Sequence, residues 1–270
     1  MKQDPFLQNS AIVTGASLGI GRHLALQLAE KGAWLTLAAR STEELDRVVE
    51  LCRDRGGKAI AVTTDISDPS QCKALIERSI EEYGRIDTLI NNAGIGMHAR
   101  FEKLPDFSLM EKIMSVNYWG SVYCTHYSLP HLRETKGRIV LVISSGGKFV
   151  MPGSSGYCAS KHAMVGFFDT LRMELAETGI SVTASYPEWV ATGISARALV
   201  ADGKPGGIIV AQEQGAMSPE VCARLILKAA SERQRDTLSP RQKLGLVLAP
   251  FFPSLIDNIA NRTVQGPDKH

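Results

Sequence analysis

The sequence predicts an α/β protein with a doubly wound parallel β-sheet that is flanked by helices. Short apolar runs alternate along the 270 residues with longer segments of helical periodicity, the pattern of repeated βαβ units. The apolar runs are continuous, as in strands buried on both faces. The first of them passes through a glycine-rich turn directly into a helix, which is typical of this fold class.

The first strand and its turn, residues 11–21, read AIVTGASLGIG. Glycines let the backbone approach a phosphate closely, and the N-terminus of the next helix offers free N–H groups and a positive dipole end. The turn therefore predicts a phosphate-binding site. We expect it to be lined by Gly15, Ser17, Leu18, Gly19, Ile20 and Gly21.

The later elements follow the same alternation. Strands are predicted at residues 34–39, 58–63, 88–91, 138–143 and 181–186, with helices at 43–55, 69–83, 107–132, 156–178 and 219–231. Right-handed crossovers between parallel strands leave ligands at the carboxyl ends of the strands. Gly15, Asn91 and Ser144 fall at such ends, so we expect one site there. No repeat or linker interrupts residues 1–270, which predicts a single domain.

Tyr157 and Lys161 are four residues apart in a YxxxK pattern, and Ser144 precedes the tyrosine by thirteen. Residues at this spacing share a helix face. A tyrosine has an ordinary pKa of about 10, and a positive charge within about 4–6 Å lowers it toward neutrality. The pair thus predicts proton transfer in an alcohol–carbonyl interconversion. An ordinary pair on an exposed helix would look the same, so the prediction depends on the glycine-rich turn.

Five motifs in this order resemble the short-chain dehydrogenase/reductase family, and within it the steroid dehydrogenases and ketosphinganine reductases. They are TGxxxGxG at 14–21, NNAG at 91–94, VN at 116–117, Ser144 and YxxxK at 157–161. The resemblance spans about residues 9–192 and implies a Rossmann-like fold. Its catalytic tetrad falls on Asn117, Ser144, Tyr157 and Lys161. Ser145 competes with Ser144, but counting back from Tyr157 selects Ser144.

The resemblance also implies a reaction, the reversible transfer of hydride between a nicotinamide and a carbonyl carbon. Tyr157 would exchange a proton with the substrate oxygen, and Ser144 would donate a hydrogen bond to it. Lys161 would lower the pKa of the tyrosine and bind the nicotinamide ribose. Asn117 would hold a water that resupplies protons, while Asn92, Ala93 and Gly94 would line the cofactor site.

Cofactor selection is predicted at the end of the second strand, where Ala39 occupies the position of the carboxylate that selects NAD. Arg40 and Ser41 follow, and an arginine suits a 2′-phosphate. We therefore expect NADP(H) to be preferred over NAD(H). The alternative is that Arg40 only stacks on the adenine, and Leu18 stands where many NADP-using relatives carry a second basic residue.

Two further segments complete the expected cofactor site. Asp65 matches the family position that binds the adenine amino group, and Ile66 lies beside it. The alternative role for Asp65 is to cap the helix that begins near Pro69, but Asp68 is better placed for that role. After the last strand, Pro187, Val190 and Thr192 match the family segment beside the nicotinamide carboxamide. Glu188 departs from that segment, since relatives usually have glycine there.

Composition excludes several classes of protein. The formal net charge is only +2 and no long basic run occurs, so we expect no nucleic-acid partner. Five cysteines lack paired or metal-like spacing, and His98 and His126 fit a pocket rim and a helix better than a metal site. Because the first strand follows residues 1–9 at once, we expect no signal peptide and a cytoplasmic protein.

The C-terminal third predicts the substrate only in outline. Residues 193–217 are expected to form a mobile lid. Residues 240–262 are a basic and then apolar extension with three open interpretations: a subunit contact in a homodimer or homotetramer, a wall of a lipophilic pocket, or a peripheral membrane anchor. Similar tails in relatives imply a lipophilic ketone or secondary alcohol as the small-molecule substrate. A lyase or epimerase on the same fold, or a non-catalytic NADP(H)-binding regulator, is the alternative function.

Overall fold

Six parallel strands form one sheet in the order β3-β2-β1-β4-β5-β6. The computed structural model describes residues 4–206, 215–254 and 257–258. The strands are β1 (Ser10–Thr14), β2 (Trp34–Ala39), β3 (Lys58–Thr63), β4 (Thr88–Asn91), β5 (Arg138–Val142) and β6 (Ser181–Ser185). The sequence-based fold class is confirmed as Rossmann-like, although β5 and β6 each end one residue earlier than predicted.

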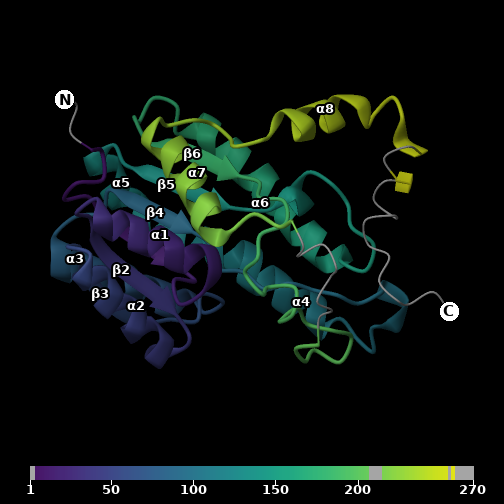
Figure 1. The fold of residues 1–270 in the computed structure, drawn as a ribbon, viewed down its shortest axis with the longest axis horizontal. Coiled ribbons are helices and arrows are strands. Elements are labelled where there is room, and N and C mark those ends of the chain that lie inside the picture. The colour runs from purple at the N-terminus through teal and green to yellow at the C-terminus, as the bar shows by residue number, and fades with distance from the viewer. Residues whose placement is uncertain (1–3, 207–214, 255–256, 259–270) are drawn as a thin grey trace.

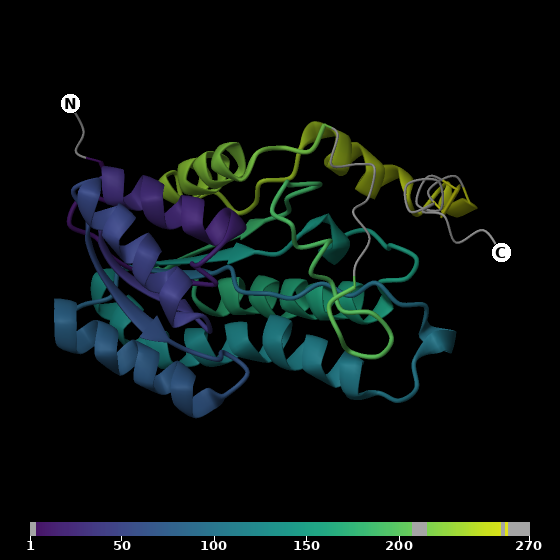
Figure 2. The same cartoon turned by 60° about the horizontal axis from the view of Figure 1, so that its bottom comes forward.

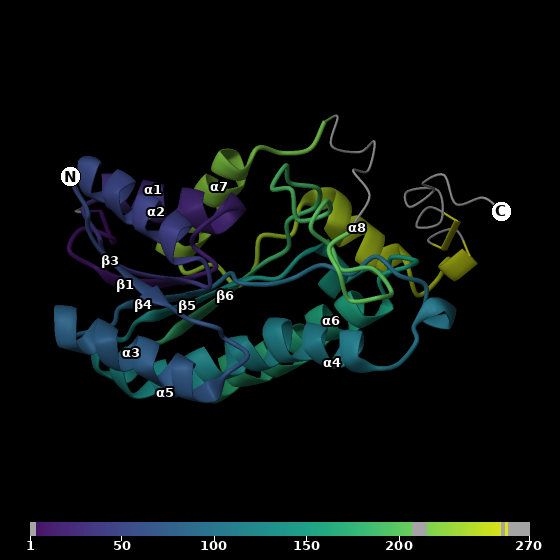
Figure 3. The same ribbon diagram turned by 90° about the horizontal axis from the view of Figure 1, so that it is seen from below.

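Helices cover both faces of the sheet (Figure 3). On one face lie α1 (Gly19–Glu30), α2 (Thr42–Asp54) and α7 (Pro219–Ser231); on the other lie α3 (Pro69–Tyr83), α4 (Ser108–Met114), α5 (Gly120–Thr135) and α6 (Ser155–Glu174). Each face has its own apolar cluster of buried side chains, centred on Leu24, Leu28 and Leu35 for the first and on Leu75, Ile139 and Phe168 for the second. Burial of these clusters on both sides explains why the strands read as continuous apolar runs.

The start of α3 shows how the sequence sets a helix boundary. The Asp68 carboxylate accepts hydrogen bonds from the backbone N–H groups of Ser70 and Gln71, and Pro69 occupies the first turn. An N-cap carboxylate satisfies donors that have no partner within the helix. Asp68 is therefore the cap, as predicted, and Asp65 is not needed for that purpose.

The helix predicted at 107–132 is not uniform. It consists of α4, a π-helical turn at Ser115–Trp119, and α5, which continues to Thr135. In the turn the N–H of Gly120 bonds to the carbonyl of Ser115, five residues earlier. Short π-helical segments widen a helix by one residue and occur frequently at functional sites. Here the widened turn contains Asn117, which the sequence assigned to the tetrad.

The outer edge of β6 is covered by residues 234–237. The backbone N–H of Ala184 donates to Arg235 O at 2.9 Å, and that of Thr237 donates to Ala184 O at 3.1 Å. This pairing occupies strand groups that would otherwise be free for another chain. It also leads the chain directly into α8 (Pro240–Leu248), which lies beyond the sheet, at the end of the molecule opposite α3 (Figures 1 and 2).

The strand order reverses between β1 and β4, which pair in parallel with Ala11 opposite Thr88. Ligands of open parallel sheets bind outside the carboxyl ends of the strands at such a point. Among the helices of the described residues, none is both long and apolar enough to cross a membrane.

Candidate active site

A cavity of about 500 Å³ opens at the carboxyl ends of β1, β4 and β5. Its size lies within the range of pockets that bind small molecules and cofactors. Most of the residues predicted for the site line it: Gly15, Ser17, Leu18, Gly19, Ile20, Arg40, Asp65, Ile66, Asn92, Ala93, Gly94, Ser144, Tyr157, Lys161, Pro187, Val190 and Thr192. Gly21, Ser41 and Asn117 are the predicted residues that do not.

The glycine positions of the glycine-rich turn have no room for a side chain. A Cβ atom at Gly15 would lie 2.7 Å from the Cα atom of Ala93, and one at Gly21 would overlap the carbonyl oxygen of Gly15. Gly15 and Gly19 also have positive φ angles of 65° and 54°, which favour glycine. The turn therefore exposes backbone to the cavity at the N-terminus of α1, as a bound pyrophosphate requires. Gly21 contributes through packing and not as a lining residue.

Thr14 and Asn92 hold this turn in place. The Thr14 hydroxyl donates to the carbonyl of Ile90 and accepts from the N–H groups of Asn92 and Ala93, at 3.0 and 3.1 Å. The Asn92 side-chain amide donates to the carbonyls of Thr14 and Gly15, at 2.9 and 3.1 Å. The asparagine motif thus fastens the end of β4 to the end of β1.

The four tetrad residues come together from three elements. Ser144 follows β5, Tyr157 and Lys161 lie on α6, and Asn117 lies in the π-helical turn. The Lys161 ammonium is 5.8 Å from the centre of the Tyr157 ring, and it donates to the carbonyl of Val142 at 3.4 Å. Ser144 and Tyr157 both line the cavity, and the serine hydroxyl is the neighbouring group that acts to lower the pKa of the tyrosine.

Asn117 supports the tetrad from behind the cavity. Its amide nitrogen donates to the carbonyl of Ile95 at 3.1 Å and to the hydroxyl of Ser160 at 3.0 Å, and its oxygen accepts from the N–H of Ile95 at 2.8 Å. Both amide hydrogens are used, so the oxygen is the side-chain atom with spare hydrogen-bonding capacity. The water-holding role that the sequence suggested stays a prediction.

Burial determines the titration of Tyr157 and Lys161. Burial raises the pKa of Tyr157 above its ordinary value, and the nearby Ser144 hydroxyl opposes that rise. Burial lowers the pKa of Lys161 to about 8. The sequence predicted that Lys161 would lower the pKa of the tyrosine, but the loss of hydration of each charged form dominates here. The tyrosine therefore keeps its proton at neutral pH.

The backbone at Ser144 is strained. Its φ and ψ angles are 149° and 159°, a combination that is otherwise populated by glycine. The serine hydroxyl accepts from the N–H of Gly146 at 3.1 Å, which begins a tight turn after β5. Such strain is maintained by the surrounding structure and is common at active sites. Ser144, and not Ser145, is the serine whose hydroxyl affects the pKa of Tyr157.

At the other end of the cavity lie Arg40 and Asp65. One carboxylate oxygen of Asp65 accepts from the N–H and the hydroxyl of Ser67, at 3.0 and 2.7 Å. Arg40 is exposed and makes no ion pair within the described part of the chain. Ser41 is the N-cap residue of α2, but its hydroxyl bonds to no backbone group of that helix. A cation and a hydroxyl are thus both available near the end of β2.

The loop that follows β6, residues 186–192, forms another wall and is called the post-β6 loop. The N–H of Ser145 donates to Pro187 O at 2.8 Å, and the N–H of Ala191 donates to Met217 O at 3.0 Å. A Cβ atom at Gly19 would lie 3.0 Å from Cβ of Thr192. The loop therefore reaches across the cavity to the glycine-rich turn.

Five of the remaining lining residues were noted from the sequence in other connections: Ala39, Val116, Ser145, Glu188 and His98. Apolar lining residues that were not named individually from the sequence include Ile95, Met97, Met151, Ile194, Ala198 and Leu199. Residues 193–206 of the predicted lid cover this part, with Leu199 O accepting from the N–H of His98 at 2.8 Å. Residues 207–214 of the lid lie outside the described residues. The sequence signal that could have identified Met97 was its place three residues after the NNAG motif.

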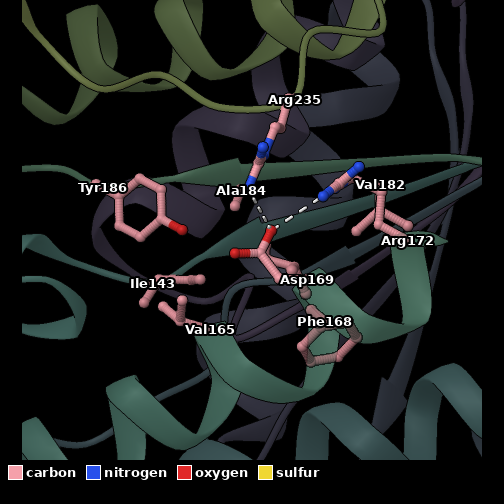
Figure 4. Close-up of a pocket in the computed structure, with 10 residues that line it drawn as sticks. Ile143, Val165, Phe168, Asp169, Arg172, Val182, Ala184, Tyr186 and Arg235 are labelled. Carbon is pink, nitrogen blue, oxygen red and sulfur yellow. Dashed lines mark hydrogen bonds and ion pairs between the residues drawn. The ribbon is translucent and has the colours of Figure 1, made fainter. Parts of the chain in front are cut away.

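A second, much smaller cavity lies behind β5 and β6, away from the tetrad (Figure 4). Asp169 lies between Arg172 and Arg235, with ion-pair distances of 3.6 and 3.3 Å, and the ring of Tyr186 is beside them. Its volume of about 10 Å³ holds one water molecule at most. It is therefore a packing defect next to an ion pair and not a ligand site.

Comparison with known proteins agrees with this geometry. Residues 9–201 match the family described as short chain dehydrogenase. The chain belongs to the short-chain dehydrogenase family. It is accordingly an oxidoreductase, with the family's glycine-rich turn, tetrad residues and sheet order all present in one structure.

Several relatives have related names. The chain is 39% identical to 11-beta-hydroxysteroid dehydrogenase-like 4A of Arabidopsis thaliana over 217 residues, which cover 80% of this chain and 71% of the relative. It is 35% identical to 11-beta-hydroxysteroid dehydrogenase of Pinus massoniana, over 91% of this chain and 71% of the relative.

A solved structure resembles the whole architecture. Alcohol dehydrogenase from the archaeon Thermococcus sibiricus, in complex with 5-hydroxy-NADP, superposes with a TM-score of 0.73 at 26% sequence identity. The match covers 85% of this chain and 94% of the other.

We expect Tyr157→Phe to lower turnover by about 10²-fold or more, because the variant keeps the ring but loses the proton that a general acid supplies. Cofactor affinity should change little. Steady-state rates and a cofactor-binding titration on the same preparation measure the two effects. Near-wild-type turnover would remove Tyr157 from the acid–base role.

Strain at Ser144 leads to a second expectation. Ser144→Ala and Ser144→Gly both remove the hydroxyl and should both lose activity, but glycine adopts the φ angle of 149° without strain. The glycine variant should be more stable than the alanine variant by about 1 kcal/mol. This difference is the strain energy that glycine relieves, minus the larger conformational entropy that glycine loses on folding. Urea unfolding measures the difference. An alanine variant that is the more stable of the two would contradict backbone strain at this position.

Proposed function

We propose that the protein is an NADP(H)-dependent dehydrogenase that interconverts a lipophilic ketone and its secondary alcohol. The observation that carries the proposal is the arrangement of Ser144, Tyr157 and Lys161 beside an apolar part of the same cavity. When bound, the nicotinamide supplies hydride transfer to or from the carbonyl carbon. The glycine-rich turn fits the cofactor's pyrophosphate. Side chains at Gly15 and Gly21 would collide with neighbouring atoms, so the backbone there stays uncovered.

Tyr157 is proposed to move the proton of the reaction. Its raised pKa keeps the hydroxyl protonated at neutral pH, so it can protonate a forming alkoxide during reduction. Ser144 lines the same cavity as Tyr157 and can donate to the same substrate oxygen. Lys161 is buried beside them, and its ammonium would attract the developing negative charge more strongly than in water.

The lipophilic substrate is proposed from the lining of the cavity. Met97, Met151 and Leu199 line it next to Tyr157, and Met97 and Leu199 belong to a buried cluster that also contains Leu109 and Ile113 of α4. An apolar wall with a few polar groups selects ligands that bury hydrocarbon surface. The names of the relatives, which are hydroxysteroid dehydrogenases, favour the same substrate class.

NADP(H) is proposed over NAD(H) because Arg40 is exposed at the cavity and has no described ion-pair partner. Ala39 at the end of β2 leaves no carboxylate for a ribose 2′-hydroxyl, and the exposed Ser41 hydroxyl adds a donor. An arginine fork and a hydroxyl suit a 2′-phosphate. The solved relative bound to an NADP analogue supports this choice.

The apolar stripe of the C-terminal extension is proposed to contact a lipid surface from the cytoplasmic side. Leu244 and Val247 of α8 are 59% and 63% exposed, and Phe251 beyond them is 74% exposed. Arg241 and Lys243 are exposed on the same helix. Apolar side chains next to basic ones are typical of peripheral membrane segments. No described residue of the extension lines the cavity, so the pocket-wall interpretation gains no support.

A homodimer or homotetramer is also proposed. Trp119 is 45% exposed and is stacked on Tyr123 with 5.7 Å between ring centres. Large aromatic side chains of this kind are enriched at subunit contacts. Sedimentation velocity in the absence of lipid measures the assembly, and a monomer at all concentrations would contradict it.

Cofactor choice can be tested directly. Wild-type protein should bind NADPH at least about tenfold more tightly than NADH, a difference of about 1.4 kcal/mol. Arg40→Ala should remove most of this preference and scarcely change the NADH affinity, whereas Arg47→Ala, an exposed arginine of α2 paired with Glu44, should leave it intact. Binding titrations measure all three, and a wild-type preference for NADH rejects the proposal. Ketones and secondary alcohols of increasing apolar area can be screened with the preferred cofactor.

The extension has its own test. Wild-type protein should sediment with vesicles that contain phosphatidylserine, and added salt should weaken this binding. Replacing Leu244, Val247 and Phe251 together by serine should abolish it, whereas Met173→Ser, which changes an exposed methionine on α6, should have no effect. Wild-type protein that stays in the supernatant would overturn membrane binding. Loss of an oligomer by the triple variant without lipid would assign the stripe to a subunit contact instead.

A further inference from the structure

The first turn of α8 contacts the post-β6 loop. Three side chains make or flank the contact: Glu188 in the loop, and Ser239 and Gln242 at the start of the helix. None of the family motifs includes α8 or Glu188. The contact therefore belongs to features of this chain that the proposed reaction does not explain.

Gln242 is the centre of this contact. The side chain is 5% exposed, which is rare for a polar residue near the surface of a terminal helix. Its amide nitrogen donates to the carbonyl of Tyr186 at 2.9 Å, and its amide oxygen accepts from the N–H of Ser239 at 2.8 Å. The amide oxygen thus stabilises the N-cap of α8, and the amide nitrogen binds the first residue of the post-β6 loop.

Two further contacts surround this bond. The Ser239 hydroxyl accepts from the N–H of Gln242 at 3.2 Å and lies 3.4 Å from a carboxylate oxygen of Glu188. A Cβ atom at Gly245 would lie 3.3 Å from the ring of Phe149, in the segment that follows Ser144. Because Ser145 is also bonded to Pro187, α8 rests on both segments that converge next to Tyr157.

The post-β6 loop depends on such external bonds. It is not part of a helix or strand, and apart from Gln242 its backbone partners include Ser145, Met217, the Arg197 side chain and the segment that covers β6. The carbonyl of Tyr186 would lose its buried donor if Gln242 were replaced by an apolar residue. An unsatisfied buried carbonyl costs free energy, so the loop would rearrange to reach water.

We propose that Gln242 is a positioning residue for the nicotinamide half of the cofactor, acting through the carbonyl of Tyr186 on the post-β6 loop. Glu188 adds a second contact to α8 where a glycine would leave the loop freer. The proposal rests on the proposed function, because hydride transfer beside Tyr157 requires the nicotinamide in the cavity that the post-β6 loop also lines. Arg40 and Asp65, which are expected to bind the adenosine half, follow β2 and β3, whereas α8 contacts the loop after β6 at the opposite edge of the sheet.

The test compares whole cofactor with its adenosine half. Gln242→Met should raise the dissociation constant of NADPH by about five- to tenfold, the value of one buried hydrogen bond. The dissociation constant of adenosine 2′,5′-bisphosphate should change less than about twofold, because its contacts are remote from α8. General unfolding or loosening of the protein would weaken both ligands alike, and that result would overturn the proposal.

Two matched variants separate the bond to Tyr186 from the helix cap. Gln242→Glu keeps an oxygen that can accept from Ser239 N but loses the donor to Tyr186 O, so it should weaken NADPH at least as much as Gln242→Met. Ser239→Ala removes the cap and the Glu188 contact but keeps that donor, and it should weaken NADPH less than about threefold. Unchanged NADPH binding in both Gln242 variants, with the fold verified by circular dichroism, would overturn the proposal.

The outcomes also separate this proposal from the choice of cofactor. If wild-type protein prefers NADH, the NADP(H) proposal fails alone, and the same comparison is made with NADH and ADP. If the Gln242 variants then weaken the dinucleotide and spare ADP, positioning through Tyr186 is supported. Binding of neither dinucleotide by wild-type protein would overturn both proposals.

Discussion

The hydroxyl of Thr14 is the interaction on which the rest of the site depends. It uses its one hydrogen and both lone pairs, bonding to Ile90, Asn92 and Ala93 at the point where the strand order reverses. This fixes the glycine-rich turn against the end of β4. From there Ile95 holds Asn117, Asn117 holds Ser160, and the Ser160 hydroxyl donates to the carbonyl of Tyr157 at 2.7 Å. The reacting groups are thus connected by hydrogen bonds to the centre of the sheet.

The fold and much of the cavity could be predicted from the sequence because both depend on local patterns. Buried parallel strands are largely apolar, and the ends of β1, β4 and β5 carry a glycine, an asparagine and a serine. Once the strands are parallel, their carboxyl ends meet, so Gly15 and Ser144 had to lie near each other although more than a hundred residues separate them. Tyr157 and Lys161 required only helical spacing.

The features of the site that the sequence did not predict depend on tertiary contacts, which residue spacing does not encode. Helical periodicity continues through residues 107–132, so the wide turn around Asn117 was invisible. Spacing placed a positive charge near Tyr157, but burial decides the direction in which both pKa values shift. That burial depends on residues distant in the sequence, such as Leu199, whose apolar cluster packs against Tyr157. The hydrogen bond from Gln242 to the carbonyl of Tyr186 joins residues that are 56 positions apart and belong to no common motif. The strain at Ser144 follows from closure of a turn between two elements.

The π-helical turn makes the helix that contains it intolerant of length changes. One residue of an α-helix corresponds to a rotation of about 100°. Removing one residue from Ser115–Trp119 would allow a regular helix, yet it would turn the face of α4 that packs against Met97 and Leu199 away from the cavity while α5 stayed seated on the sheet. The extra residue therefore sets the rotation of α4 relative to α5. With it, α5 packs on the sheet while α4 packs against Met97 and Leu199 beside the cavity. Lineages that lose or gain a residue here should have to rebuild the substrate wall.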